Sequence, residues 1–200
     1  MRNTRIVIVC LVMAVATLAV AAASLASCLS AATEATLVAP FATGIDEMLL
    51  DGVIWLEWDD AGRYELVIGS YPTDVFVKHD DEYFYIAMVI HTDGPLDQGL
   101  EAFVFFDNGD GVNYSTGDDM LVVSAQDGAL LEADYYYPAT YNFRRDADVG
   151  GTNDALGAGK YDDSEQCYVF EFRRLINSED PHDMRLIVGE PFSATYGWAG

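Results

Sequence analysis

The sequence predicts an all-β protein, an antiparallel sandwich or barrel, that follows an export segment. From residue 45 onward, short runs rich in Val, Ile, Phe and Tyr alternate with Gly, Asp and Pro, a pattern typical of strands and tight turns. No window of a dozen residues keeps a helical period, although residues 95–101 are compatible with a short helical turn. Residues 6–23 carry no charge and follow Arg2 and Arg5, as in a signal segment.

The N-terminal segment also contains a candidate lipidation site. Residues 25–28 read LASC and resemble the lipobox of prokaryotic lipoproteins, in which the cysteine, here Cys28, is lipidated and becomes the first mature residue. An uncleaved anchor and ordinary secretion with cleavage after Ala31 are the alternatives. Each of the three places the remainder in the cell envelope or outside the cell. The expected organisation is a signal peptide over 1–27, a tether over 28–44 and a folded domain over 45–200.

The charge of the chain is strongly negative. Its formal net charge is −23, with 22 Asp and 11 Glu against only two lysines, Lys78 and Lys160. Such a surface repels phosphate backbones, so a nucleic-acid partner is not expected. It attracts cations, and it also suits salty water, in which screening removes the repulsion between like charges. Half of the residues are apolar, which is enough for a substantial core.

The patterning predicts ten strands, and the residues between them predict loops. The expected strands cover residues 52–58, 63–69, 74–79, 83–92, 101–107, 119–125, 129–137, 166–174, 185–189 and 192–199. Apolar side chains occupy both faces of 83–92, so this strand is expected at the centre of a sheet. Residues 29–44 read as a tether, and residues 146–163 read as a long mobile loop. Cys167 is expected to be a buried thiol.

The order of several short motifs resembles that of the DOMON-like sandwiches. These include family-nine carbohydrate-binding modules and the haem-binding domain of ethylbenzene dehydrogenase gamma subunits. The matching positions are Asp51, Gly52, Trp58, Tyr83, Tyr85, Ala87, Glu171, Arg174, Leu175, Asp183, Leu186 and Gly189, within residues 50–199. The resemblance implies an immunoglobulin-like β-sandwich that binds a ligand rather than a hydrolase. It leaves the ligand open between a sugar and haem.

A candidate calcium loop lies in the segment FFDNGDGVNYSTGDD, residues 105–119. It fails the EF-hand pattern, because Gly109 and Gly111 replace oxygen ligands and Val112 replaces the required glycine. Calcium also accepts carboxylates, amides and carbonyls on other flexible loops. The candidate ligands are Asp107, Asn108, Asp110, Asn113, Asp118 and Asp119. The alternative is a solvated hairpin turn, since Asp-Asn-Gly runs are common in turns.

Aromatic side chains provide the candidates for sugar binding. Three consecutive tyrosines in the segment DYYYPATY cannot all face the core of a strand, because alternate side chains point to opposite faces. The predicted contacts to a glycan are Tyr135, Tyr137 and Tyr141. Core packing is the alternative role for each of them.

The remaining functional alternatives have less support in the sequence. Haem b needs two axial ligands, which the scattered Met, His and Lys side chains can supply, and no CxxCH motif for covalent haem is present. No HExxH or GxSxG motif is present, and an enzyme is not expected. The sequence therefore predicts an exported, membrane-tethered binding module for a glycan or another extracellular ligand. A haem-binding electron-transfer domain and an extracellular scaffold or adhesion lipoprotein are the alternatives.

Overall fold

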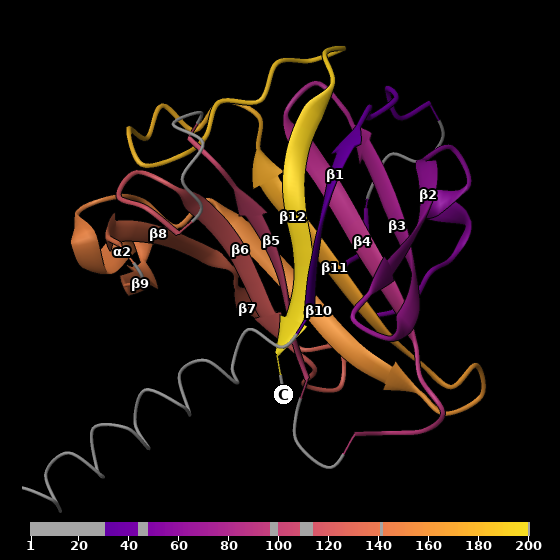
Figure 1. Cartoon of the computed structure of the whole chain (residues 1–200). Helices are drawn as coiled ribbons and strands as arrows, with labels where there is room; N and C mark the ends of the chain where they lie inside the picture. The colour runs from indigo at the N-terminus through magenta and orange to yellow at the C-terminus, as the bar shows by residue number, and fades with distance from the viewer. Residues whose placement is uncertain (1–30, 44–47, 97–99, 109–113, 141, 200) are drawn as a thin grey trace, which may run out of the picture.

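Two antiparallel six-stranded sheets pack face to face in the computed structural model, which describes residues 31–43, 48–96, 100–108, 114–140 and 142–199 (Figure 1). The first sheet has the order β1 (Ala31–Leu37), β12 (Phe192–Ala199), β5 (Glu101–Phe106), β6 (Asp119–Ser124), β8 (Asp134–Ala139) and β9 (Asn142–Arg145). The second has the order β2 (Gly62–Ile68), β3 (Tyr71–His79), β4 (Tyr83–His91), β11 (Cys167–Leu175), β10 (Ala155–Asp162) and β7 (Leu130–Glu132). The predicted all-β sandwich is confirmed.

The main core lies between the sheets, and β4 is its central strand. Phe84, Ile86, Met88 and Ile90 point from β4 toward the first sheet and belong to this core. The opposite face of β4 is also buried, because the segment around Trp58 packs over it. Along its whole length β4 pairs with β11, which also contributes rings to the core. The prediction of a two-sided, buried central strand is confirmed.

The segment predicted as a strand over 52–58 is not one. It contains a short 3-10 helix, η1 (Leu56–Trp58), and a turn at Gly52, whose φ of +75° suits glycine. A Cβ at Gly52 would also lie 2.6 Å from the Cβ of Lys160. Trp58 and Ile54 cover the outer face of the second sheet. The apolar side chains of this segment pack on the face of the second sheet, and the segment itself does not pair as a strand.

The expected loop over 146–163 contains a helical turn, α2 (Asp146–Val149), and the eight-residue strand β10. The sequence of β10 does not show the usual strand pattern, because glycine occupies positions where most strands carry larger side chains. A Cβ at Gly159 would lie 2.7 Å from the ring of Phe170, and one at Gly157 would lie 2.9 Å from a backbone oxygen of Glu171. The large rings of β11 therefore require a strand of small residues beside them.

Three further boundaries differ from the prediction. Residues 31–37, assigned to the tether, form β1 and pair with β12 over their full length. The expected strand 129–137 divides at Ala133 into β7 in the second sheet and β8 in the first. Residues 185–189 form no strand; they belong to a long connection between β11 and β12 in which Ile187 and Val188 are exposed. Cys167 is buried as expected, and burial raises the pKa of its thiol to about 11.

The strand register gives the first sheet two distinct ends. Ala31 of β1 pairs with Trp198 of β12 at one end, and Leu37 pairs with Phe192 at the other. The ring of Phe106 lies 6.4 Å from that of Phe192, and Phe106 in turn pairs with Asp119. Asp119 therefore lies toward the Leu37 end. Among the described residues, no helix has the length and apolar character needed to cross a membrane.

Candidate functional site

An aromatic cluster covers the outer face of the first sheet and contains one of the predicted ligand-binding tyrosines. Tyr137 is 4% exposed and packs edge-on against Phe105, with ring centroids 5.7 Å apart. Tyr114 lies against both rings. The hydroxyl of Tyr137 is directed at the sulfur of Met120, 3.9 Å away. Tyr137 is thus a supporting residue of this cluster, and its ring is not accessible to a ligand.

The accessible part of the same cluster lies on β8 and β9. Phe143 is 50% exposed, and its ring centroid lies 5.8 Å from those of Tyr135 and Tyr137. Tyr135 is half-buried and pairs across the strands with Arg145, whose guanidinium lies 3.2 Å from a carboxylate oxygen of Glu132. We call Tyr135, Phe143, Arg145 and Glu132 the platform. The platform combines aromatic rings with hydrogen-bonding groups. Tyr141, the third predicted ligand-binding tyrosine, lies outside the described residues.

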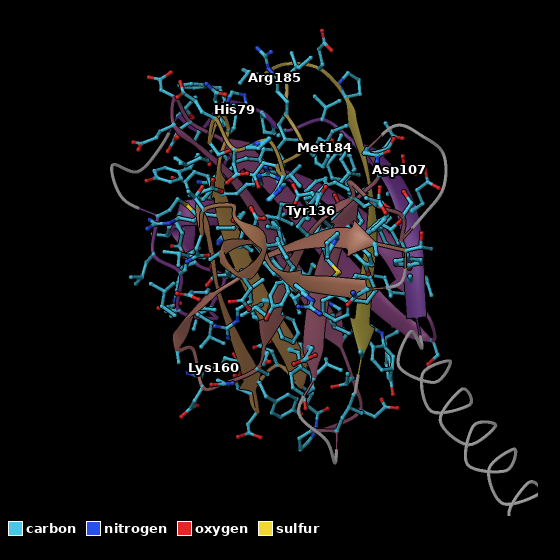
Figure 2. The ribbon with its side chains drawn as sticks, turned by 90° about the vertical axis from the view of Figure 1, so that its left-hand side faces the viewer. His79, Asp107, Tyr136, Lys160, Met184 and Arg185 are labelled. Atoms are coloured by element: carbon cyan, nitrogen blue, oxygen red, sulfur yellow. The ribbon has the colours of Figure 1, made fainter. Side chains whose placement is uncertain are left out.

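The predicted calcium loop is partly described. Asp118 is buried and accepts hydrogen bonds from the backbone N–H groups of Asn108, at 3.1 Å, and Ser115, at 2.6 Å. The side-chain amide of Asn108 donates to the Thr116 carbonyl at 3.1 Å. These bonds hold the two sides of the hairpin together, and Asp107, labelled in Figure 2, directly follows β5 and precedes Asn108. Asp110 and Asn113 lie outside the described residues, so calcium at this loop stays a prediction.

Asp119, the sixth candidate ligand, belongs to a different group. One of its carboxylate oxygens accepts a hydrogen bond from the Met184 backbone, at 3.0 Å, and a short one from Arg174. Arg174 is buried too, and its guanidinium lies 3.5 Å from Asp183. The sequence missed this pairing, because Asp119 is 55 positions from Arg174 and 65 positions from Met184.

Two more aspartates complete this buried acidic centre, which we define as Asp119, Asp134, Asp154 and Asp183. Asp134 accepts a hydrogen bond from the Asp154 backbone at 3.1 Å. Burial, followed by the charge of Asp183, raises the pKa of Asp134 to about 8 and that of Asp154 to about 7. Burial likewise raises the pKa of Asp119, against the effect of Arg174. Asp119 and Asp134 are the first residues of β6 and β8. Asp154 comes from the segment before β10, and Asp183 comes from the connection after β11.

A second acidic group lies next to the centre. The Nδ1 atom of His182 is 2.6 Å from Asp146 and 3.7 Å from Asp180, and its ring stacks on Tyr136 with centroids 4.3 Å apart. Tyr136 lies in the middle of the view in Figure 2. Burial raises the pKa of Asp146 to about 6, and the hydrogen bond to His182 opposes this change. Asp180 also accepts hydrogen bonds from Thr152, which fastens the connection after β11 to the segment after α2.

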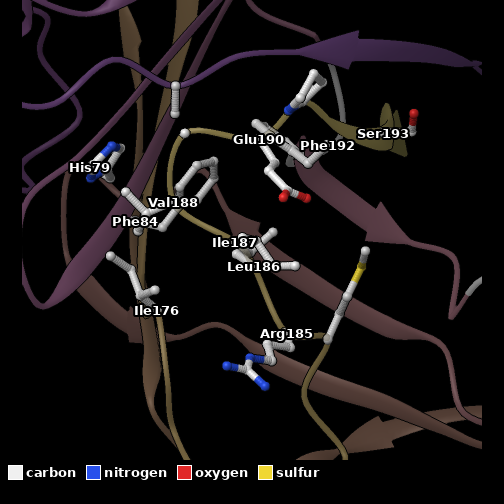
Figure 3. A pocket seen from close by; sticks show the side chains of 14 residues that line it. His79, Phe84, Ile176, Arg185, Leu186, Ile187, Val188, Glu190, Phe192 and Ser193 are labelled. Atoms are coloured by element: carbon white, nitrogen blue, oxygen red, sulfur yellow. The ribbon is translucent and has the colours of Figure 1, made fainter.

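A cavity of about 210 Å³ opens at the Leu37 end of the sandwich (Figure 3). Apolar side chains dominate its lining, among them Phe84, Ile176 and Leu186, and His79 and Met184 also line it. His79 has its Nδ1 atom 3.1 Å from the backbone oxygen of Asp80. The cavity therefore brings together two of the side chains that the sequence offered as haem ligands.

Four of the residues that carry the family resemblance, Asp51, Gly52, Trp58 and Glu171, form one hydrogen-bond network. Glu171 is fully buried and accepts hydrogen bonds from the backbone of Asp51 and Gly52, at 2.8 and 2.7 Å, and from the indole of Trp58, at 2.8 Å. Burial raises the pKa of Glu171 to about 7, although the three donors lower it. This network fastens the segment before β2 to the second sheet, which is a structural role.

Comparisons with known proteins give no assignment. No protein-family model matches the chain, and no curated protein matches it.

Proposed function

We propose that this chain is an exported, membrane-tethered module that binds carbohydrate at the platform on β8 and β9. One observation carries the proposal: Phe143 and Tyr135 form an accessible aromatic surface directly beside the Arg145–Glu132 ion pair. A pyranose ring presents C–H groups that pack on an aromatic face and hydroxyls that exchange hydrogen bonds with charged side chains. The platform offers both kinds of contact, and the buried Tyr137 supports its rings from below.

The lipid tether follows from Cys28 and the position of β1. If the lipidated Cys28 is the first mature residue, only two residues lie between it and Ala31, the start of β1. A chain that short spans at most about 11 Å, so the Trp198 end of the first sheet would lie close to the bilayer. The platform lies along the outer face of the sheet, because Tyr135 is in register with Met120 and Phe105 in the middle strands. A glycan would thus approach from the side.

A glycan array probed with the full-length protein in detergent tests the carbohydrate proposal. The expected result is binding to a defined saccharide class, weakened about tenfold or more in Phe143→Ala and Tyr135→Ala. Trp55→Ala is the matched control, because Trp55 is an exposed aromatic residue outside the platform. Unchanged binding by both platform variants, or no binding to any glycan by the parent, would overturn the proposal. The second outcome would leave the scaffold alternative.

Haem binding is the second candidate function, because His79 and Met184 both line the cavity. Imidazole and thioether groups are a known axial pair for haem iron, and when bound the haem would supply one-electron chemistry. The cavity does not fit it as it stands, because about 210 Å³ is below the roughly 300–1,000 Å³ of ligand pockets. The visible spectrum of the purified protein decides this point. A Soret band lost in His79→Ala and Met184→Leu would establish haem, and its absence after haem addition would exclude this candidate.

A further inference from the structure

The buried acidic centre holds more negative charge than its surroundings neutralise. Its four carboxylates, those of Asp119, Asp134, Asp154 and Asp183, lie near one guanidinium, that of Arg174. With every group ionised, the formal charge of this set is −3. Burial of uncompensated charge is strongly unfavourable, so such a centre needs either bound protons or a bound cation.

Several carboxylate oxygens of the centre have no hydrogen-bond donor among the described residues. The side chain of Asp183 is only 5% exposed, and its Oδ2 atom accepts no hydrogen bond. Both carboxylate oxygens of Asp154 are buried without a donor as well. Native proteins rarely leave buried acceptors in this condition, and a bound ion is one of the few physical reasons for it. The unmatched oxygens belong to side chains that lie beside the other two aspartates. The backbone N–H of Asp154 bonds to Asp134, the charge of Asp119 helps to raise the pKa of Asp154, and the charge of Asp183 helps to raise the pKa of Asp134.

The spacing of the oxygens suits a hard divalent cation. One carboxylate oxygen each from Asp119, Asp134 and Asp183 lies within 4.8 Å of the other two. Calcium binds oxygen ligands at about 2.4 Å, so ligands on opposite sides of the ion are separated by about 4.8 Å. Magnesium usually keeps several waters and takes only one or two carboxylates, whereas calcium accepts several carboxylates, as this set of aspartates offers.

We propose that the buried acidic centre is a divalent-cation site whose preferred ion is Ca²⁺, with Asp119, Asp134, Asp154 and Asp183 as ligands. The four ligands come from the start of β6, the start of β8, the segment before β10 and the connection after β11. An ion here joins the first sheet to the two segments that carry the second acidic group. It differs from the calcium loop that the sequence predicted, since it shares only Asp119 with that set. The proposal is independent of carbohydrate binding.

Titration calorimetry of the EDTA-treated, full-length protein with CaCl₂, at constant ionic strength, tests the site. The parent is expected to show saturable binding of one ion per chain. Asp154→Asn and Asp183→Asn are expected to weaken it about tenfold or more, since each removes one ligand charge. Asp154→Asn is the safer variant, because the described structure gives its carboxylate no hydrogen bond to lose. Circular dichroism confirms that each variant is folded.

Asp163→Asn is the matched control, because it removes an exposed carboxylate from the turn between β10 and β11 and none from the centre or the hairpin. It is expected to bind calcium with the affinity of the parent. Asp107→Asn, which removes a carboxylate from the hairpin alone, distinguishes the centre from the loop that the sequence predicted. Three results would overturn the proposal: no saturable binding by the parent, equal affinity in the Asp154 and Asp183 variants, or loss of binding in Asp107→Asn alone. The third result would assign the ion to the hairpin.

Discussion

Glu171→Gln tests which of two opposing effects controls the buried network around Glu171. Burial disfavours the charged carboxylate, whereas hydrogen bonds from Asp51, Gly52 and Trp58 favour it. Burial is the larger effect and raises the pKa of Glu171 from 4.5 to about 7. Glutamine has nearly the same shape as the protonated carboxylic acid and, like it, is uncharged and replaces one anionic acceptor with a donor group. The variant therefore imitates the protonated protein at every pH.

The magnitude follows from the linkage between protonation and folding. Between pH 4.5 and pH 7 the folded protein keeps a proton on Glu171 that the unfolded chain releases, so the free energy of unfolding falls as the pH rises. The full change is about 3 kcal/mol, complete slightly above pH 7. The variant lacks this loss. We expect Glu171→Gln to match the parent near pH 4 and to be more stable by about 3 kcal/mol at pH 8.

Urea denaturation followed by tryptophan fluorescence, repeated from pH 4 to pH 8 at fixed ionic strength, measures this difference. The comparison with the variant is necessary because raised pKa values at Asp134, Asp146 and Asp154 give the parent further pH dependence of the same sign. Glu165→Gln, on the surface, is the control and should track the parent at every pH. If Glu171→Gln is instead less stable than the parent at pH 8, the hydrogen bonds outweigh burial and the reasoning fails.

Three other predictions concern the tether, the surface charge and the core. Cys28→Ala is expected to abolish lipid labelling of the mature protein, and persistent labelling would contradict the lipoprotein assignment. Added NaCl is expected to raise the melting temperature of this chain of charge −23 by screening repulsion, and a melting temperature unchanged up to molar salt would contradict that reasoning. Gly159→Ala is expected to cost about 2 kcal/mol of folding free energy, because its Cβ would lie 2.7 Å from the Phe170 ring. A denaturation midpoint equal to that of the parent would show that this ring moves aside easily.

The sequence was informative about strands with large apolar side chains and uninformative about strands without them. The alternation in 83–92 and 166–174 predicted β4 and β11 almost to the residue, because burial there depends on the size of the side chains. β1 and β10 were missed for the opposite reason. Their small residues carry little periodic signal, and they become strands only because β12 and β11 supply complete pairing partners. The apolar run over 52–58 was wrongly predicted as a strand, because its side chains are buried by packing on the face of the second sheet and not by strand pairing.

The candidate sites also differ in whether a local sequence pattern marks their residues. The sequence singled out Tyr135 as a candidate because three adjacent tyrosines cannot share one face of a strand. It gave no signal for Phe143, which lies on a strand that was not predicted. The acidic centre had no signal of its own. Its four aspartates are spread from position 119 to 183 in a chain with 33 acidic residues, and nothing in their spacing distinguishes them from the others. What distinguishes them is burial, and burial depends on the register of β6 with β8 and on Arg174 reaching across from β11.

A carboxylate that folding withdraws from water must acquire a donor, a proton or a cation, and Arg174 supplies donors for only part of this set. The centre is therefore the place in the described structure where the strongly acidic composition has a chemical consequence that surface repulsion does not explain.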